Sequence, residues 1–255
     1  MYIPFFKSHY SLNKSILTLE KDHADVGPKS ILKLCKENEI DNPFLVEDNM
    51  SSFLEMYYNS KDLGINMRFG LRLCVCDNFQ EKNEASLKCE SKFLIFLKDS
   101  SGYENLNKIF SFASKEGFYY IPRIDFNKLE EYWSDSLILG VPFYDSYLFN
   151  NFFKMSSCVP KKLWTNPVFF WEENGLPFDK IFKKILQNHV DTNHQKSELI
   201  KSKSIYYNNS DDFLAYLTMR CIGKKSSLQK PKLDHLCSDQ FSLEHYLNSK
   251  QCKKT

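Results

Sequence analysis

Long apolar runs and glycines are both scarce in this sequence. A membrane-spanning helix needs about 18 or more apolar residues, and no stretch approaches that length, so we expect no transmembrane segment. The chain has only 8 glycines but 22 phenylalanines and 14 tyrosines, a composition unlike that of disordered or low-complexity chains. The first nine residues also lack the basic flank and apolar run of a signal peptide.

Paired cysteine motifs are also missing, and the net charge is small. The eight cysteines include no CxxC pair, and a disulfide framework is uncommon in a chain of this length, so we expect reduced, buried thiols and a cytoplasmic protein. The many Lys, Asn, Phe, Tyr and Ile residues suggest an AT-rich genome, viral or endosymbiotic; a viral protein would act in the host cytoplasm. The 34 basic and 32 acidic residues predict no strong nonspecific attraction to nucleic acid or lipid.

The stretch from residue 93 to residue 132 shows what is present instead. Phe93–Leu97 is a short apolar run typical of a buried strand. After a polar turn, apolar residues at helical spacing predict a helix that Gly117 ends. An extended segment follows, and Asp125 can cap a second helix through Tyr132.

The rest of the chain repeats this alternation. The other expected strands are 2–6, 43–46, 67–76, 137–139, 168–171 and 205–207. The other expected helices are 30–38, 52–63, 146–155, 177–189 and 211–221, with a shortened or frayed helix in 191–203. Residues 77–91 are polar and predict a solvated excursion between two strands. Such alternation favours an α/β fold with a parallel sheet, and about this many units can close a barrel.

The segment GFYYIPRID at residues 117–125, with the strand and helix before it, resembles the PHP (polymerase and histidinol phosphatase) domain of the bacterial DNA polymerase III alpha subunit. The resemblance extends to the opening residues, to 44–49, to 64–75 and to 204–243. It implies a distorted seven-stranded β/α barrel, a single domain over residues 1–250, with a polar tail at 251–255. It also implies a PHP domain alone, without the palm, fingers, thumb and clamp-binding regions of the polymerase.

Active members of that family bind up to three divalent metals at the C-terminal mouth of the barrel, through His, Asp and Glu side chains. Residue by residue, this chain departs from that pattern at nearly every ligand position. The resemblance therefore implies a degenerate former metal site, with no catalytic residue, metal or cofactor. Its positions are Phe5, Lys7, Glu47, Asp48, Arg72, Lys92, Ser204 and Tyr206.

Three of these replacements, Lys7, Arg72 and Lys92, are cations. A cation about 4 Å from a metal costs about 4 kcal/mol per unit charge at an effective dielectric near 20. We expect the three cations to pair with Glu47 and Asp48 in an internal salt-bridge network instead. Charges on loops are usually solvated, but a separate basic loop offers weaker candidates for phosphate contact. Its residues are Lys224, Lys225, Lys230 and Lys232.

Three functions remain open on this basis. The first is a catalytically inactive PHP-like module that binds polymerase, proofreading-exonuclease or clamp components in DNA replication. The second is a decoy that mimics the PHP surface of a host polymerase and inhibits it. The third is an active metal-dependent phosphoesterase with a rebuilt site, for which His189 and His194, on either side of Asp191, are candidates. The missing ligands favour the first two functions.

Overall fold

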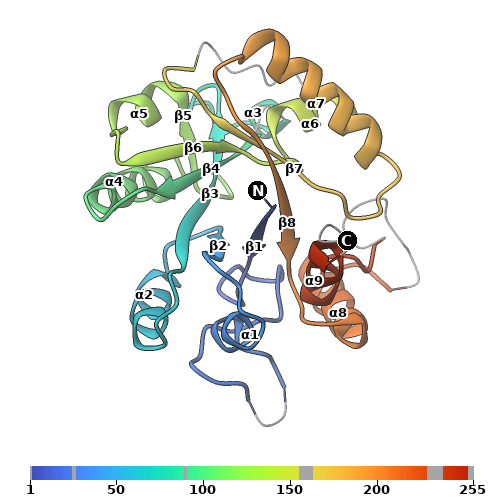
Figure 1. The fold of residues 1–255 in the computed structure, drawn as a ribbon. Helices are drawn as coiled ribbons and strands as arrows, with labels where there is room; N and C mark the ends of the chain where they lie inside the picture. The colour runs from blue at the N-terminus through green and yellow to red at the C-terminus, as the bar shows by residue number, and fades with distance from the viewer. Residues whose placement is uncertain (1, 25–26, 89–90, 155–162, 229–237, 252–255) are drawn as a thin grey trace.

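A closed ring of seven strands forms the centre of the protein (Figure 1). The computed structural model describes residues 2–24, 27–88, 91–154, 163–228 and 238–251. Going round the ring, each strand pairs with the next, and the last pairs with the first. In that order the strands are β1 (Tyr2–Phe6), β2 (Phe44–Glu47), β3 (Arg68–Cys76), β4 (Ser91–Leu97), β6 (Leu137–Val141), β7 (Val168–Trp171) and β8 (Leu199–Ile205).

Strand direction confirms the expected barrel. Neighbours in the ring run parallel except at β4, which is antiparallel to both β3 and β6. A short eighth strand, β5 (Arg123–Asp125), pairs with the second half of β3, while β2 pairs with the first half. The fold is therefore a distorted seven-stranded β/α barrel built as a single domain. The predicted boundaries, 1–250 with a tail at 251–255, stay a prediction, since 252–255 lie outside the described ranges.

Helices surround the ring on its outer side (Figure 1). Their apolar faces pack against the strands and form the larger of two hydrophobic cores; α4, for example, buries Leu106, Ile109 and Ala113, as predicted. The helices are α1 (Ile31–Glu37), α2 (Phe53–Asp62), α3 (Glu84–Lys88), α4 (Gly102–Ser114), α5 (Phe126–Glu131), α6 (Tyr147–Phe153), α7 (Asp179–Asn193), α8 (Phe213–Lys224, after the 3-10 turn Ser210–Asp212) and α9 (Leu243–Gln251).

The smaller core lies inside the barrel and consists largely of aromatic rings. Phe5 packs edge-on against Phe170 with ring centroids 4.9 Å apart, and Phe96 lies 5.8 Å from each of them. Two glycines make room for these rings: a Cβ on Gly70 would lie 2.5 Å from the Phe96 ring, and one on Gly140 would lie 2.9 Å from Phe170. The rings fill the barrel beneath its C-terminal mouth.

The GFYYIPRID segment has a packing role. Its Arg123 is fully buried and donates to Ser86 Oγ and to the Glu81 carbonyl, both at 3.1 Å, so it fixes the 77–91 excursion to the barrel. Gly117 is required there because a Cβ would lie 1.8 Å from the Arg123 carbonyl oxygen. Asp125 caps α5 as expected, accepting a hydrogen bond from the Lys128 amide at 2.9 Å.

Several elements of the structure differ from those expected from the sequence. Strand β8 begins at Leu199, inside a segment where a frayed helix was expected. The prediction failed because two lysines interrupt the apolar pattern of the strand. Lys201 lies over the Tyr2 and Trp171 rings, and Lys203 donates to the Glu173 carbonyl. The polar excursion at 77–91 contains α3, and a further helix, α9, follows the last expected helix at 211–221. On α2, Met56 is buried but the neighbouring Tyr57 is 47% exposed.

Candidate functional site at the barrel mouth

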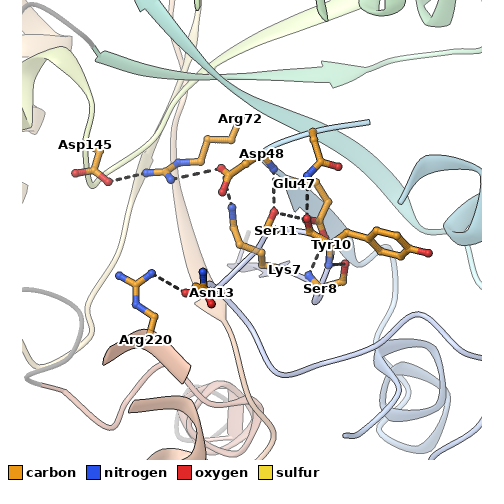
Figure 2. A network of polar contacts seen from close by, with 11 residues as sticks. Lys7, Ser8, Tyr10, Ser11, Asn13, Glu47, Asp48, Arg72, Asp145 and Arg220 are labelled. Atoms are coloured by element: carbon orange, nitrogen blue, oxygen red, sulfur yellow. Dashed lines mark hydrogen bonds and ion pairs between the residues drawn. The ribbon is translucent and has the colours of Figure 1, made fainter. Parts of the chain in front are cut away.

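Four charged side chains from distant parts of the sequence meet at the C-terminal mouth of the barrel (Figure 2). Lys7 follows β1, Asp48 follows β2, and Asp145 follows β6, so the parallel strands deliver all three to one end. Arg72 lies in β3 one residue beyond its last pairing with β2, at Leu71. The strand ends therefore place two cations and two carboxylates together.

These four residues form a chain of ion pairs (Figure 2). Lys7 Nζ lies 3.0 Å from Asp48 Oδ1, and Arg72 Nη1 lies 3.7 Å from the same oxygen. The other end of the guanidinium, Nη2, lies 2.8 Å from Asp145 Oδ2. The Lys7 and Arg72 side chains are only 6% and 13% exposed, against 29% for Asp48. Arg72 thus bridges two carboxylates at the edge of the interior.

Burial and neighbouring charges shift the pKa of three members of this chain, Asp48, Arg72 and Lys7. Burial by itself would raise the pKa of Asp48, but the charges of Lys7 and Arg72 outweigh burial and hold that pKa well below its usual range. Burial opposes the charge of Arg72 as well, yet Asp145 and Asp48 raise its pKa. Burial lowers the pKa of Lys7, which Asp48 partly offsets. Asp48 is therefore the carboxylate that the two cations share, while Asp145 is the closer partner of Arg72.

Glu47 and Lys92, which were expected in the network, stand outside it. The Glu47 carboxylate is buried and accepts from the Ser8 amide at 2.7 Å and from the Ser11 hydroxyl, so it organises the loop after β1. Burial raises its pKa. The Lys92 amide donates to the Asp145 carbonyl at 2.8 Å. Its ammonium lowers the pKa of Asp48 but forms no ion pair with any residue the structure describes.

The other expected positions divide between the interior and the wall of the mouth. Phe5 belongs to the aromatic core below the network. Ser204 donates to Glu172 from its amide at 2.9 Å and from its hydroxyl at 2.8 Å. Tyr206 stacks on the Tyr216 and Phe241 rings, with centroids 5.7 and 5.4 Å away. Among the basic-loop candidates, Lys224 ends α8 beside the mouth and Lys225 follows it in a left-handed conformation, while Lys230 and Lys232 lie outside the described residues.

Sequence reasoning missed five charged residues at this mouth: Lys14, Asp145, Lys154, Glu172 and Arg220. Asp145 and Glu172 follow the ends of β6 and β7, so their place after strand ends is a signal that could have found them. Glu172 is buried, is held by Ser204 and Asn174, and has its pKa raised by burial. Lys14 and Arg220 come from a loop and from a helix, and no local pattern distinguishes them.

The residues at the mouth do not fit a divalent metal. Asp48 and Asp145 are the carboxylates best placed to bind one, and each is already paired with a cation. Within the described ranges, no group of three or more His, Cys, Asp or Glu side chains is arranged to hold a metal ion. A metal would also lie beside Lys7 and Arg72, whose positive charge opposes it.

The network makes a prediction about acid stability. The pKa of Asp48 is lower in the folded protein than in the unfolded chain, where it is about 3.9. Its contribution is therefore fully present above that value and is lost as pH falls through it towards the folded pKa. We expect the free energy of unfolding to fall less between about pH 5 and pH 3 in Asp48→Asn than in the unaltered protein. Urea denaturation at each pH measures this, and identical pH dependence in both proteins would contradict it.

No helix in the described part of the chain is long and apolar enough to cross a membrane. The cysteines in that part, Cys35, Cys74, Cys76 and Cys221, are all buried, and none forms a disulfide. The compartment in which the protein works stays a prediction.

Comparison with known proteins identifies the family. The PHP domain model matches residues 8–148, which is more than half of the chain. DNA polymerase III subunit alpha of Aquifex aeolicus is 27% identical over 151 residues, 56% of this chain and 13% of that protein. The subunits of Chlamydia trachomatis and Borreliella burgdorferi are each 34% identical, over 33% and 35% of this chain. These two matches cover 7% and 8% of the relatives, so the chain corresponds to a small part of each polymerase subunit. The chain belongs to the PHP domain family.

Proposed function

We propose that this protein is a catalytically inactive PHP-like module that binds polymerase, proofreading-exonuclease or clamp components in DNA replication. The observation that supports it most is the ion-pair chain Lys7–Asp48–Arg72–Asp145 at the barrel mouth. It places two buried cations at the end of the barrel where metals would act, while the barrel itself is intact.

The physical argument for inactivity concerns water activation. Metal-dependent phosphoester hydrolysis needs a cation to lower the pKa of a bound water and to neutralise charge on the phosphoryl oxygens. A metal entering this mouth would have to break the pairs of Asp48 with Lys7 and Arg72. Lys7 would then be buried without an ion pair among the described residues, and Arg72 would keep Asp145 alone. Breaking a buried pair costs about 3–5 kcal/mol.

The argument for a replication partner comes from the relatives. The three that are compared above are DNA polymerase III alpha subunits, and the match is to their PHP regions. A PHP fold that has lost its metal ligands keeps only its surface for function. A binding role and an inhibitory decoy would use the same surface, and the effect on DNA synthesis separates them.

We expect no hydrolysis of nitrophenyl phosphate or of DNA 3′ ends by the purified protein, with or without added Mn²⁺ or Zn²⁺. The reason is that Lys7 and Arg72 occupy the carboxylates that a metal would use. Asp48→Asn is the control for contaminating phosphatases, because a contaminant's activity would not change. Chelator-sensitive hydrolysis that disappears in Asp48→Asn would overturn the proposed inactivity.

The binding part of the proposal is tested with purified components. DNA polymerase III alpha subunit, exonuclease and clamp from the organism that makes the protein, or from its host, are each titrated against it by calorimetry. Primer extension is then measured with the protein at saturation. We expect saturable binding of at least one component with DNA synthesis preserved. Binding with strong inhibition would replace the module by the decoy, and no binding to any component would contradict both.

A further inference from the structure

A cavity of about 350 Å³ lies beside the ion-pair chain, between the barrel mouth and α8. Its volume is at the lower end of the range typical of small-molecule sites, about 300–1,000 Å³. The charged part of its wall is almost entirely basic. The cations that line it are Lys7, Lys14, Arg72, Lys154, Arg220 and Lys224.

Carboxylates do not balance this charge. Asp145 is the acidic residue in the wall, and Asp48 lies behind it in the ion-pair chain. Six cations therefore face two carboxylates among the described residues, an excess of four positive charges. The chain as a whole carries only +2, so the excess is a local feature of this cavity.

Two of the cations, Arg220 and Lys14, are only partly satisfied by the residues that the structure describes. Arg220 is 7% exposed, and its Nη1 donates to the Asn13 carbonyl at 3.1 Å (Figure 2). Its Nε has no hydrogen-bond partner among the described residues. A buried guanidinium N–H without an acceptor is costly and marks a place for one. The Lys14 ammonium forms no ion pair with a described residue. Burial and the nearby Arg72 and Arg220 lower its pKa to about 8, despite the opposing charge of Asp48.

We propose that this cavity is a metal-independent binding site for a phosphomonoester, held mainly by Arg220 and Lys14. A guanidinium donates two parallel hydrogen bonds to phosphoryl oxygens, and an ammonium adds a point charge. The dianion would balance part of the excess of four positive charges. The aromatic walls formed by Phe178 and Tyr206 give an apolar surface for the organic part of the ligand.

This site differs from a metal-dependent phosphoesterase centre because protein cations supply the positive charge. It would bind the phosphate group without hydrolysing it, since none of the described wall residues activates a water as a metal ion does. The inference does not need a replication partner, and it stands whichever protein the surface binds. Two sources offer the same chemistry: a free mononucleotide, or the phosphorylated end of a nucleic acid strand.

The test is calorimetric titration in EDTA with three probes: a nucleoside 5′-monophosphate, a 5′-phosphorylated oligonucleotide and the same oligonucleotide without its phosphate. We expect a Kd below about 1 mM for a phosphorylated probe, and at least about tenfold weaker binding without the phosphate. The tighter of the two phosphorylated probes identifies the source. No binding of either phosphorylated probe, or equal binding of the two oligonucleotides, would overturn the proposal.

Variants assign the binding to this cavity. Arg220→Gln and Lys14→Gln each remove a charge-assisted hydrogen bond, so we expect about tenfold or greater loss of affinity for each. Lys225→Gln is the matched control: it removes the same charge one residue beyond Lys224 but outside the cavity wall, and should bind as the unaltered protein does. Lys14 lies on a loop and is only partly buried, so Lys14→Gln keeps the test decisive if Arg220→Gln fails to fold. Unchanged affinity in Lys14→Gln, or binding that requires Mn²⁺, would contradict the assignment.

Discussion

Arg72→Ala should lower the melting temperature by about 4–8 °C. The substitution leaves Asp48 without one partner and Asp145 without its closest one. Deleting one member of a buried pair costs about 3–5 kcal/mol, and an exposed pair contributes about 1 kcal/mol or less. Because the Arg72 side chain is 13% exposed but Asp145 is 39% exposed, we expect about 2 kcal/mol, between these limits.

The matched control is Arg68→Ala, on the same strand. Arg68 is exposed and lies over the Phe44 ring without an ion pair in the described part of the chain, so its removal should cost under about 1 kcal/mol. Equal melting temperatures for Arg72→Ala and the unaltered protein would show that the ion-pair chain contributes nothing to stability. Partner binding should survive Arg72→Ala; its loss at full stability would instead make the mouth the interface.

Gly117→Ala should destabilise the fold by about 3 kcal/mol or more. The added Cβ would lie 1.8 Å from the Arg123 carbonyl oxygen, and a backbone atom cannot move aside as the end of a flexible side chain can. The backbone shift would also disturb the contacts that Arg123 makes with Glu81 and Ser86. Chemical denaturation measures the loss.

Gly64→Ala is the comparison for that variant. Gly64 has φ +69° and nothing within 4 Å of its Cβ position, so only backbone strain of about 1–2 kcal/mol applies. If Gly117→Ala were no more destabilising than Gly64→Ala, the close approach of residues 117 and 123 would not be a feature of the folded protein.

Local patterns were sufficient to predict most of the barrel. The apolar run of β4, the helical spacing in α4 and the Asp125 cap each depend on neighbouring residues, so sequence alone indicates them. Strand β8 was placed too late because Lys201 and Lys203 occupy strand positions that usually hold apolar residues. Their ammonium groups are accommodated by rings and a carbonyl from other elements, which no local pattern reveals.

The same limit applies to the mouth. The pairing of Lys7 and Arg72 with Asp48 follows from positions that the PHP resemblance assigns to one site. Asp145 completes the chain of ion pairs from a turn after β6, where the expected carboxylate was Glu47. Glu47 instead accepts hydrogen bonds from Ser8 and Ser11, in the loop that follows Lys7. The choice between two carboxylates depends on side-chain geometry that spacing does not encode.

The most direct measurement of the central claim is a calorimetric titration of the metal-stripped protein with Mn²⁺, beside a variant that carries Lys7→His and Arg72→Glu. Lys7 and Arg72 are the two cations paired with Asp48, and the variant replaces both with groups that bind metals. The ion-pair account predicts no stoichiometric Mn²⁺ binding by the unaltered protein and measurable binding by the variant if it folds. One or more equivalents of Mn²⁺ bound by the unaltered protein, and lost in Asp48→Asn, would contradict the account.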